Sequence, residues 1–261
     1  MRILMLGDLV GKPGRDAAQS VLPTLRELHS PDLVVVNGEN AAAGLGITPE
    51  ISKSLFGCGV DVITLGNHSW SRRAIFDYLD REPRIVRPAN YPEGTPGRGF
   101  TVVTSREGQK VAVANLQART FMEALDHPFR TADAILNSVR SQTRITLFDF
   151  HGEATSEKIA LGHYLDGRAS AVVGTHTHVQ TADETILPGG TAYITDIGMV
   201  GPQDSVLGMD KDIVVRRFLT QIPNRFEVAV GPVVLCGIVI DIDSATGRSQ
   251  TIERIQIRDI I

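Results

Sequence analysis

The stretch Ile3-Leu-Met-Leu-Gly-Asp8 decides the fold, because it is the first of three short apolar runs that each end at a small residue followed by polar ones. The other two are Leu33-Val-Val-Val-Asn-Gly-Glu-Asn40 and Val60-Asp-Val-Ile-Thr-Leu-Gly-Asn-His68. Helical patterns over 15–28 and 48–56 separate the runs, and another follows over 71–79. The second helix opens on Thr48-Pro49-Glu50, which is typical of a helix N-terminus. This β-α-β-α-β alternation predicts a parallel sheet covered by helices.

The second half of the chain predicts more strands and a more antiparallel arrangement. A Pro- and Gly-rich loop over 87–99 separates it from the first half. We expect helices over 131–140, 155–165 and 210–219, and strands over 100–104, 111–115, 145–150, 171–173, 192–195, 226–230, 233–240 and 249–257. No repeat or long linker divides the chain. The sequence therefore predicts an α/β fold in which residues 1–261 form one domain with two packed sheets.

Composition excludes several classes of protein. The 261 residues are 42% hydrophobic and 21% charged, as in globular proteins rather than disordered or fibrous ones. A net charge of −4 argues against a surface that wraps nucleic acid. Two cysteines exclude a disulfide framework and a thiolate zinc site. No signal peptide or bilayer-spanning run is visible, so we expect a cytoplasmic protein without membrane association.

Metal-competent side chains follow five of the predicted strands. In open α/β sheets, sites form outside the carboxyl ends of the strands. His176 and His178 give the strongest single signal, since alternate residues of an extended segment point the same way. Taken singly, each group has a structural explanation as a turn, a cap or a surface histidine. Taken together, they predict a metal site built from Asp8, Glu39, Asn40, Asn67, His151, His176 and His178.

The predicted ligands form a chemically specific set. Two carboxylates, two amides and three imidazoles without a thiolate suit Zn, Fe, Mn or Ni. Seven ligands exceed the needs of one ion, and a carboxylate such as Glu39 can bridge two ions about 3.5–4 Å apart. Such a pair stabilises the attacking and leaving oxygens of an in-line displacement at phosphorus.

The motifs around these residues resemble those of the calcineurin-like metallophosphoesterases, and more closely those of the bacterial YmdB-like phosphodiesterases. The resemblance extends from Met1 to about Val230. It implies a metallophosphoesterase-like α/β sandwich of two mixed β-sheets flanked by helices. The stretches that carry it are Gly7-Asp-Leu-Val-Gly-Lys-Pro-Gly-Arg15, Asn37-Gly-Glu-Asn-Ala-Ala-Ala-Gly-Leu-Gly46, Asp149-Phe-His-Gly-Glu-Ala-Thr-Ser-Glu-Lys158, Gly174-Thr-His-Thr-His-Val-Gln-Thr181 and Thr195-Asp-Ile-Gly-Met-Val-Gly-Pro202.

The resemblance also implies a role for each site residue. Asp8, Glu39, Asn40 and His178 would hold one metal, and Glu39 would bridge to a second held by Asn67, His151 and His176. His68 would bind no metal and would donate a proton to the leaving oxygen. The implied cofactors are two metal ions, iron in the family, with Mn or Zn as alternatives. The segment from Gly198 to Asp210 would cover the substrate.

Three motifs depart from those of the wider superfamily, and the second of them reads Gly38-Glu39-Asn40 here in place of Gly-Asp. The superfamily's first motif is Asp-x-His, whereas Asp8 is followed here by Leu9-Val10. The YmdB-like pattern implies that Asn40 takes the place of that missing histidine. The superfamily's third motif adds a carboxylate after Asn-His, whereas His68 is followed here by Ser69.

The resulting hypothesis is a dinuclear-metal phosphodiesterase that hydrolyses cyclic nucleotides, either 2′,3′-cyclic or 3′,5′-cyclic. Hydroxide shared by the two metals would attack phosphorus, with His68 as the acid. Two alternatives stay open: a metal-dependent amide or ester hydrolase, and a regulatory protein with a residual metal site. The expected partner is a small phosphodiester rather than a stably bound nucleic acid or a membrane, and a homo-oligomer is compatible with the sequence.

Overall fold

The three apolar runs of the N-terminal third pair as neighbouring parallel strands in the computed structural model, which describes residues 1–261. They belong to a seven-stranded mixed sheet, here called sheet one. In spatial order it contains β13 (Ser249–Ile260), β12 (Val233–Ile242), β11 (Met199–Pro202), β1 (Arg2–Leu9), β2 (Leu33–Asn37), β3 (Val62–Thr64) and β4 (Ile85–Val86). Strands β1 to β4 and β11 run parallel, and β12 and β13 are antiparallel to their neighbours.

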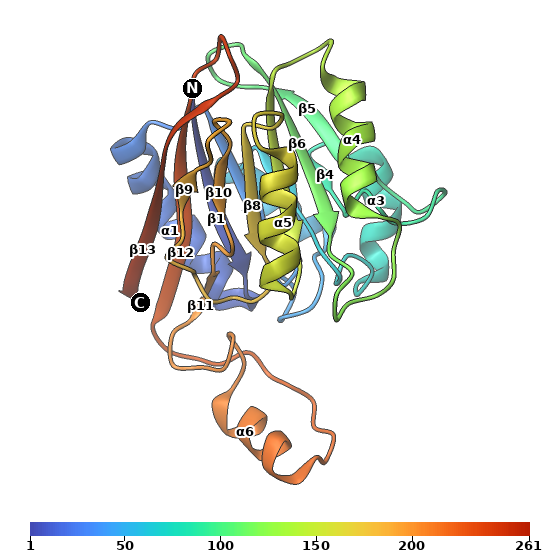
Figure 1. Ribbon diagram of the computed structural model, residues 1–261. Coiled ribbons are helices and arrows are strands. Elements are labelled where there is room, and N and C mark those ends of the chain that lie inside the picture. The colour runs from blue at the N-terminus through green and yellow to red at the C-terminus, as the bar shows by residue number, and fades with distance from the viewer.

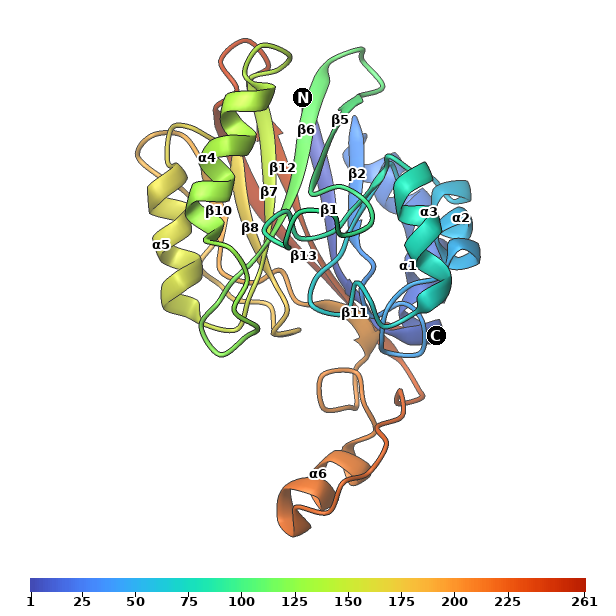
Figure 2. The ribbon, with the colours of Figure 1, turned by 90° about the vertical axis from the view of Figure 1, so that its right-hand side faces the viewer.

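A second mixed sheet, sheet two, faces the first (Figure 2). In spatial order it contains β5 (Phe100–Thr104), β6 (Lys110–Gln117), β7 (Ile145–His151), β8 (Ala171–Thr175), β10 (Ala192–Ile194) and β9 (Thr185–Ile186). The predicted hairpin pairs β5 with β6, and β6, β7, β8 and β10 run parallel. The predicted α/β architecture of two mixed sheets is confirmed.

Helices cover the outer face of each sheet (Figure 2). One side carries α1 (Gly11–His29), α2 (Pro49–Gly57) and α3 (Phe76–Arg81), with a 3-10 turn at Arg73–Ile75 before α3. The other side carries α4 (Pro128–Val139) and α5 (Thr155–Leu165). Both faces of the central strands are therefore buried, and this explains why their sequences are continuous apolar runs rather than alternating ones.

Alternate residues of each strand supply different cores. Ile3 and Met5 of β1 pack in the core between the sheets, together with Leu147 of β7. Leu4 and Leu6 face the other way and pack in the core beneath α1. A third core lies between sheet two and its helices. This period of two fixes which side of every strand can contribute to a site between the sheets.

The last helix, α6 (Lys211–Thr220), lies on an arm that projects from the end of the sandwich where β11 terminates (Figure 1). Asp210 caps α6, since its carboxylate accepts the backbone N–H groups of Asp212 and Ile213. The chain leaves sheet one after β11 and returns into β12.

The structure corrects several predicted elements. The strand expected over 226–230 is wrong, because this segment runs along the arm with only an isolated bridge between Val228 and Met209. Helix α1 begins at Gly11 rather than Arg15, since Pro13 is tolerated in a first turn that needs no N–H partner. The short strands β4, β9 and β11 were not predicted. Each has four residues or fewer and depends on a neighbouring strand rather than on local pattern.

Candidate metal centre

The seven predicted ligands gather between the two sheets, at the carboxyl ends of the parallel strands. Asp8 is near the end of β1, Glu39 and Asn40 follow β2, and Asn67 follows β3. His151 is the last residue of β7, and His176 and His178 follow β8. The expected convergence of five strand ends is confirmed by contacts that join the two sheets.

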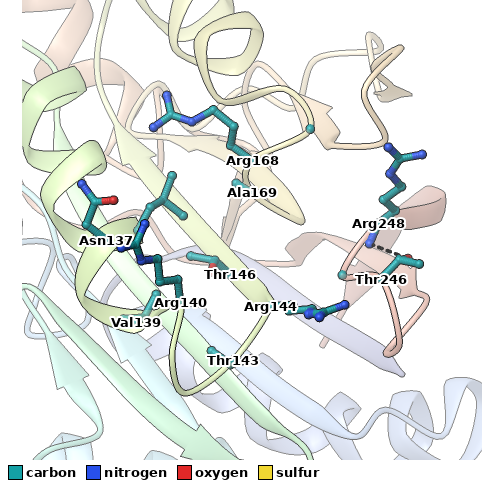
Figure 3. Close-up of a pocket in the computed structure, with 13 residues that line it drawn as sticks. Asn137, Val139, Arg140, Thr143, Arg144, Thr146, Arg168, Ala169, Thr246 and Arg248 are labelled. Atoms are coloured by element: carbon teal, nitrogen blue, oxygen red, sulfur yellow. Dashed lines mark hydrogen bonds between the residues drawn. The ribbon is translucent and has the colours of Figure 1, made fainter.

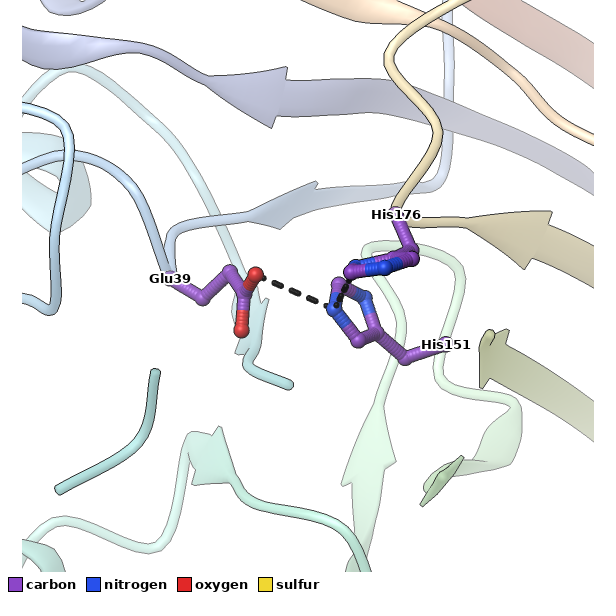
Figure 4. A group of neighbouring side chains, drawn as sticks. All are labelled: Glu39, His151 and His176. Atoms are coloured by element: carbon purple, nitrogen blue, oxygen red, sulfur yellow. Dashed lines mark hydrogen bonds and ion pairs between the residues drawn. The ribbon is translucent and has the colours of Figure 1, made fainter. Parts of the chain in front are cut away.

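The tightest part of the site joins Glu39, His151 and His176 (Figure 4). Nε2 of His151 lies 3.0 Å from Oε1 of Glu39 and 3.1 Å from Nδ1 of His176. Oδ1 of Asn67 is 2.9 Å from the same Nε2 atom. Three atoms that can each accept a hydrogen bond or bind a cation therefore surround one ring nitrogen.

Gly66 makes this close approach possible. A Cβ atom at this position would lie 2.3 Å from Oε2 of Glu39 and 2.4 Å from the ring of His151. Such distances are far inside van der Waals contact. The absence of a side chain at the position before Asn67 is therefore required by the close packing of the site.

A buried hydrogen-bond chain orients His151. The hydroxyl of Thr175 donates to Oδ1 of Asp149 at 2.6 Å, so it accepts from Nδ1 of His151 at 2.9 Å. Asn37 donates to the other oxygen of Asp149 at 3.2 Å. The chain places a proton on Nδ1 and turns Nε2 toward Glu39, the orientation that histidines adopt when they bind metals.

A second group of contacts joins Asp8, Asn40 and His178. Nε2 of His178 lies 2.9 Å from Nδ2 of Asn40 and 3.8 Å from Oδ1 of Asp8. Nδ1 of His178 donates to the carbonyl of Leu207 at 3.0 Å, which leaves the Nε2 lone pair facing the site. The base of the α6 arm thus fixes the ring of His178.

Asp8 is a buried carboxylate with an unpartnered oxygen. Its side chain is 0% exposed, Oδ1 makes no hydrogen bond, and Oδ2 only accepts the N–H of His176 at 3.3 Å. Burial raises its pKa to about 7, although His178 and His151 oppose the shift. An unpartnered buried charge is costly, and the orphaned oxygen sits beside imidazoles. The residues therefore fit a bound cation.

The other site groups show how strongly the charges interact. Burial lowers the pKa of His151, but Glu39 outweighs it and the pKa rises to about 9. The pKa of Glu39 falls to about 2, because His151 outweighs the effect of burial. Burial and the neighbouring His151 lower the pKa of His176 to about 3. His176 is therefore neutral near pH 7, which is the form that binds a metal.

His68 lies at the edge of the site. Its backbone N–H donates to Oε2 of Glu39 at 2.9 Å, which ties its loop to the acidic centre. Its ring is partly exposed, and Nε2 lies 3.4 Å from Nδ2 of Asn67. Burial lowers its pKa despite the nearby Glu39. The His68 ring can therefore contact a molecule bound at the site, although it is not enclosed by the candidate metal ligands.

The prediction that His176 and His178 point the same way along an extended segment was wrong, although both side chains reach the site. Both have positive φ angles, 99° and 64°, so the segment is not extended. The N–H of Thr177 between them donates to Asp196 at 3.0 Å and bends the loop. His176 consequently turns to Glu39 and His151, whereas His178 turns to Asp8 and Asn40.

The predicted site did not include the residues that hold the candidate ligands in position. Asp149 had a detectable signal, since it lies two residues before His151 and hence on the same face of the strand. Lys158 and Asp196 form a fully buried ion pair at 2.8 Å beneath the His176–His178 loop. Glu153 lies 3.3 Å from Nε2 of His176. None of these three stands out in the sequence, because the contacts are made between distant segments.

None of the helices combines the length and the apolar composition that a membrane-spanning segment requires.

Two mixed sheets flanked by helices, with carboxylate, amide and imidazole groups at the ends of their parallel strands, make up a fold that other solved structures share. The calcineurin-like phosphoesterase YfkN from Bacillus subtilis has this fold, with a TM-score of 0.56 at 13% identity over 100% of this chain and 90% of that one. The chain belongs to the YmdB-like protein family, whose model matches residues 4–255.

Two relatives are similar over almost the whole chain. The 2′,3′-cyclic-nucleotide 2′-phosphodiesterase of Bacillus subtilis (strain 168) is 55% identical over 259 residues, which are 99% of this chain and 98% of that protein. The crystal structure of a hypothetical protein from Thermus thermophilus superposes with a TM-score of 0.93 at 41% identity, covering 99% of this chain and 100% of that one.

Proposed function

We propose that this protein is a cation-dependent phosphodiesterase that hydrolyses 2′,3′-cyclic nucleotides. The observation that carries the proposal is the buried cluster of carboxylate, amide and imidazole groups around the orphaned oxygen of Asp8. The likeness to the Bacillus subtilis 2′,3′-cyclic-nucleotide 2′-phosphodiesterase supports the choice of substrate.

Two cations would be held by the two groups of contacts in the site. Asp8, Asn40 and His178 would bind one, Asn67, His151 and His176 the other, and Glu39 would bridge them. Iron is the ion we expect, and Mn or Zn would suit the same ligands. When bound, the cations supply positive charge for the transition state and activate water for attack on phosphorus.

The chain's own residues orient the reacting groups. Asp149 and Thr175 hold His151 with its Nε2 toward the centre. Glu39 anchors the loop that carries His68 through the backbone N–H of that histidine. We assign His68 as the acid that protonates the leaving oxygen. A phosphate anion beside its ring would favour the imidazolium form and offset the effect of burial on its pKa.

Replacement of His68 by alanine tests this assignment. We expect His68→Ala to retain both cations and to lower turnover of 2′,3′-cyclic AMP by about 10²–10⁴-fold, the usual contribution of a general acid. His163→Ala is the matched control, because that histidine lies on the exposed face of α5. Turnover and elemental analysis would be measured on the same preparations.

The outcomes separate the competing assignments. A His68→Ala variant with wild-type turnover would remove the acid role. Loss of cations in that variant would instead make His68 a ligand. A wild-type protein that holds two cations yet leaves cyclic nucleotides intact would contradict the proposed function itself.

A further inference from the structure

A pocket lies near the start of β7 (Figure 3), whereas the candidate metal centre lies at the carboxyl end of that strand. The pocket has a volume of about 330 Å³, and four segments form it: the end of α4, the turn before β7, the turn before β8 and the turn between β12 and β13. Thr146 at its base is five residues before His151 on β7, which corresponds to about 17 Å along the strand. The pocket is thus separate from the proposed catalytic site.

Positive charge dominates this pocket. Four of its lining residues are arginines, and none of the 13 is aspartate or glutamate. This concentration is notable in a chain whose net charge is −4. The arginines are Arg140, Arg144, Arg168 and Arg248.

Only part of that charge is neutralised within the chain. Arg168 pairs with Asp133 and stacks over Tyr164. Arg144 donates to the backbone carbonyl of Ala245 at 3.1 Å, which leaves its charge uncompensated. The guanidinium groups of Arg140 and Arg248 have no hydrogen bond or ion pair within the chain, so they are free to bind an anion.

Two carboxylates close in sequence to the lining residues bind backbone groups of the surrounding turns and are not part of the lining. Asp243 accepts from the backbone N–H of Ala245 and from the hydroxyl of Thr246. Asp166 accepts the backbone N–H groups of Gly189 and Thr191. These bonds hold the turns that shape the pocket.

The base of the pocket carries an unpartnered polar group. Thr146 is 2% exposed and lines the pocket, and its backbone N–H is bonded to Ser170. Its hydroxyl makes no hydrogen bond within the chain. The oxygen of this hydroxyl is not fully buried, so it is accessible from the pocket and can donate to an acceptor oxygen of a ligand there.

We propose that this pocket binds an anion that carries two or more phosphate groups. Guanidinium groups match phosphate oxygens with paired hydrogen bonds. The four arginines come from different segments around a 330 Å³ pocket, and since each guanidinium can pair with two oxygens, they exceed the four oxygens of one phosphate and suit a pyrophosphate unit. The volume lies within the range of small-molecule sites, so a free oligophosphate or a nucleoside diphosphate fits better than a polymer.

Titration calorimetry of the cation-loaded protein with pyrophosphate and with ADP tests the proposal. The pocket variant is Arg140→Gln/Arg248→Gln. The matched control is Arg81→Gln/Arg130→Gln, which makes the same change in net charge at exposed arginines without ion pairs. We expect the pocket variant to bind pyrophosphate at least about tenfold more weakly than wild type, because it loses two charged hydrogen-bond donors. The control should bind normally, and both variants should hydrolyse bis(p-nitrophenyl) phosphate at the wild-type rate.

The two probes identify the source of the phosphates. Tighter binding of ADP than of pyrophosphate, lost in the pocket variant, supports a nucleotide, and equal binding supports an oligophosphate alone. Unchanged binding in the pocket variant would overturn the proposal, as would equal weakening in the control. A pocket variant that loses binding of a single-stranded RNA decamer but keeps both small probes would also overturn it.

Discussion

Asp8 and Asp196 are both completely buried, but the carboxylate of Asp196 is fully paired, whereas one oxygen of Asp8 has no partner. Asp196 pairs with Lys158 at 2.8 Å and accepts the backbone N–H groups of Thr177 and Gly198 at 3.0 and 2.9 Å. Asp8 receives one weak N–H bond, and its other oxygen has no partner. Asp196 is paired with the Lys158 ammonium and holds the backbone at Thr177 and Gly198, whereas the free oxygen of Asp8 faces the cluster of candidate ligands.

The difference separates a structural charge from a binding charge. A buried carboxylate must be paired or its desolvation destabilises the fold. Lys158 supplies that pair for Asp196, which in turn fixes the loop between His176 and His178. Gly198, held by Asp196, offers its carbonyl to the backbone N–H of Asp8 at 3.1 Å. The satisfied carboxylate thus positions the unsatisfied one.

The largest expected effect comes from removing the internal partner of Asp196. Lys158→Met should lower the free energy of unfolding by about 3–5 kcal/mol, because it leaves an uncompensated buried charge. Urea denaturation would measure the loss, both in EDTA and with excess Mn²⁺. Lys110→Met at an exposed position is the control. A loss below about 1 kcal/mol would show that Asp196 does not depend on Lys158.

The pH dependence of the stability of the cation-free protein should reveal the titration of the buried groups that are proposed to bind a cation. The pKa of Asp8 is about 7 against an ordinary 3.8, so folding is progressively disfavoured as pH rises from about 4 to about 7. The pKa of His151 is about 9 against 6.5, so its stabilising contribution is complete below pH 6.5 and is lost as pH rises toward 9.

Thermal melts at several pH values would measure this effect. In EDTA, we expect the free energy of unfolding to fall by on the order of 3 kcal/mol between pH 6.5 and pH 9. Excess Mn²⁺ should reduce the fall, because ionised Asp8 and neutral His151 are the forms that bind metal. The Mn²⁺-induced rise in Tm should therefore be larger at pH 8.5 than at pH 6. Parallel pH curves with and without Mn²⁺ would refute the assignment of these residues as ligands.

The smallest expected effect concerns the support behind His151. Thr175→Val removes the hydroxyl that joins Asp149 to Nδ1 of His151, with little change in volume. Cation affinity should fall by about 10–100-fold, as for other residues that orient a metal-binding histidine. Thr175→Ser keeps the hydroxyl and should bind nearly as wild type. If both variants bind equally, the hydroxyl does not orient the ring.

Local patterns predicted the bounds of some elements correctly. The helix over 155–165 and the strand over 100–104 match the structure residue for residue. The apolar pattern over 226–230 failed, because no sheet edge is available along the α6 arm to complete a strand there. Strand formation depends on a neighbour, and no local pattern reports whether that neighbour exists.

The sequence by itself determined the α/β class and which side chains stand at the strand ends, since both follow from apolar periodicity and from the residues that end each run. Only the tertiary structure decided which of these groups meet. The bend at Thr177 sends His176 and His178 to different partners, and contacts between distant segments make Lys158, Asp149 and Thr175 part of the site. The physical reason is that burial and pairing depend on which chain segments pack together. Only that packing shows that one oxygen of Asp8 lacks a partner and that arginines from distant segments line the same pocket as Thr146.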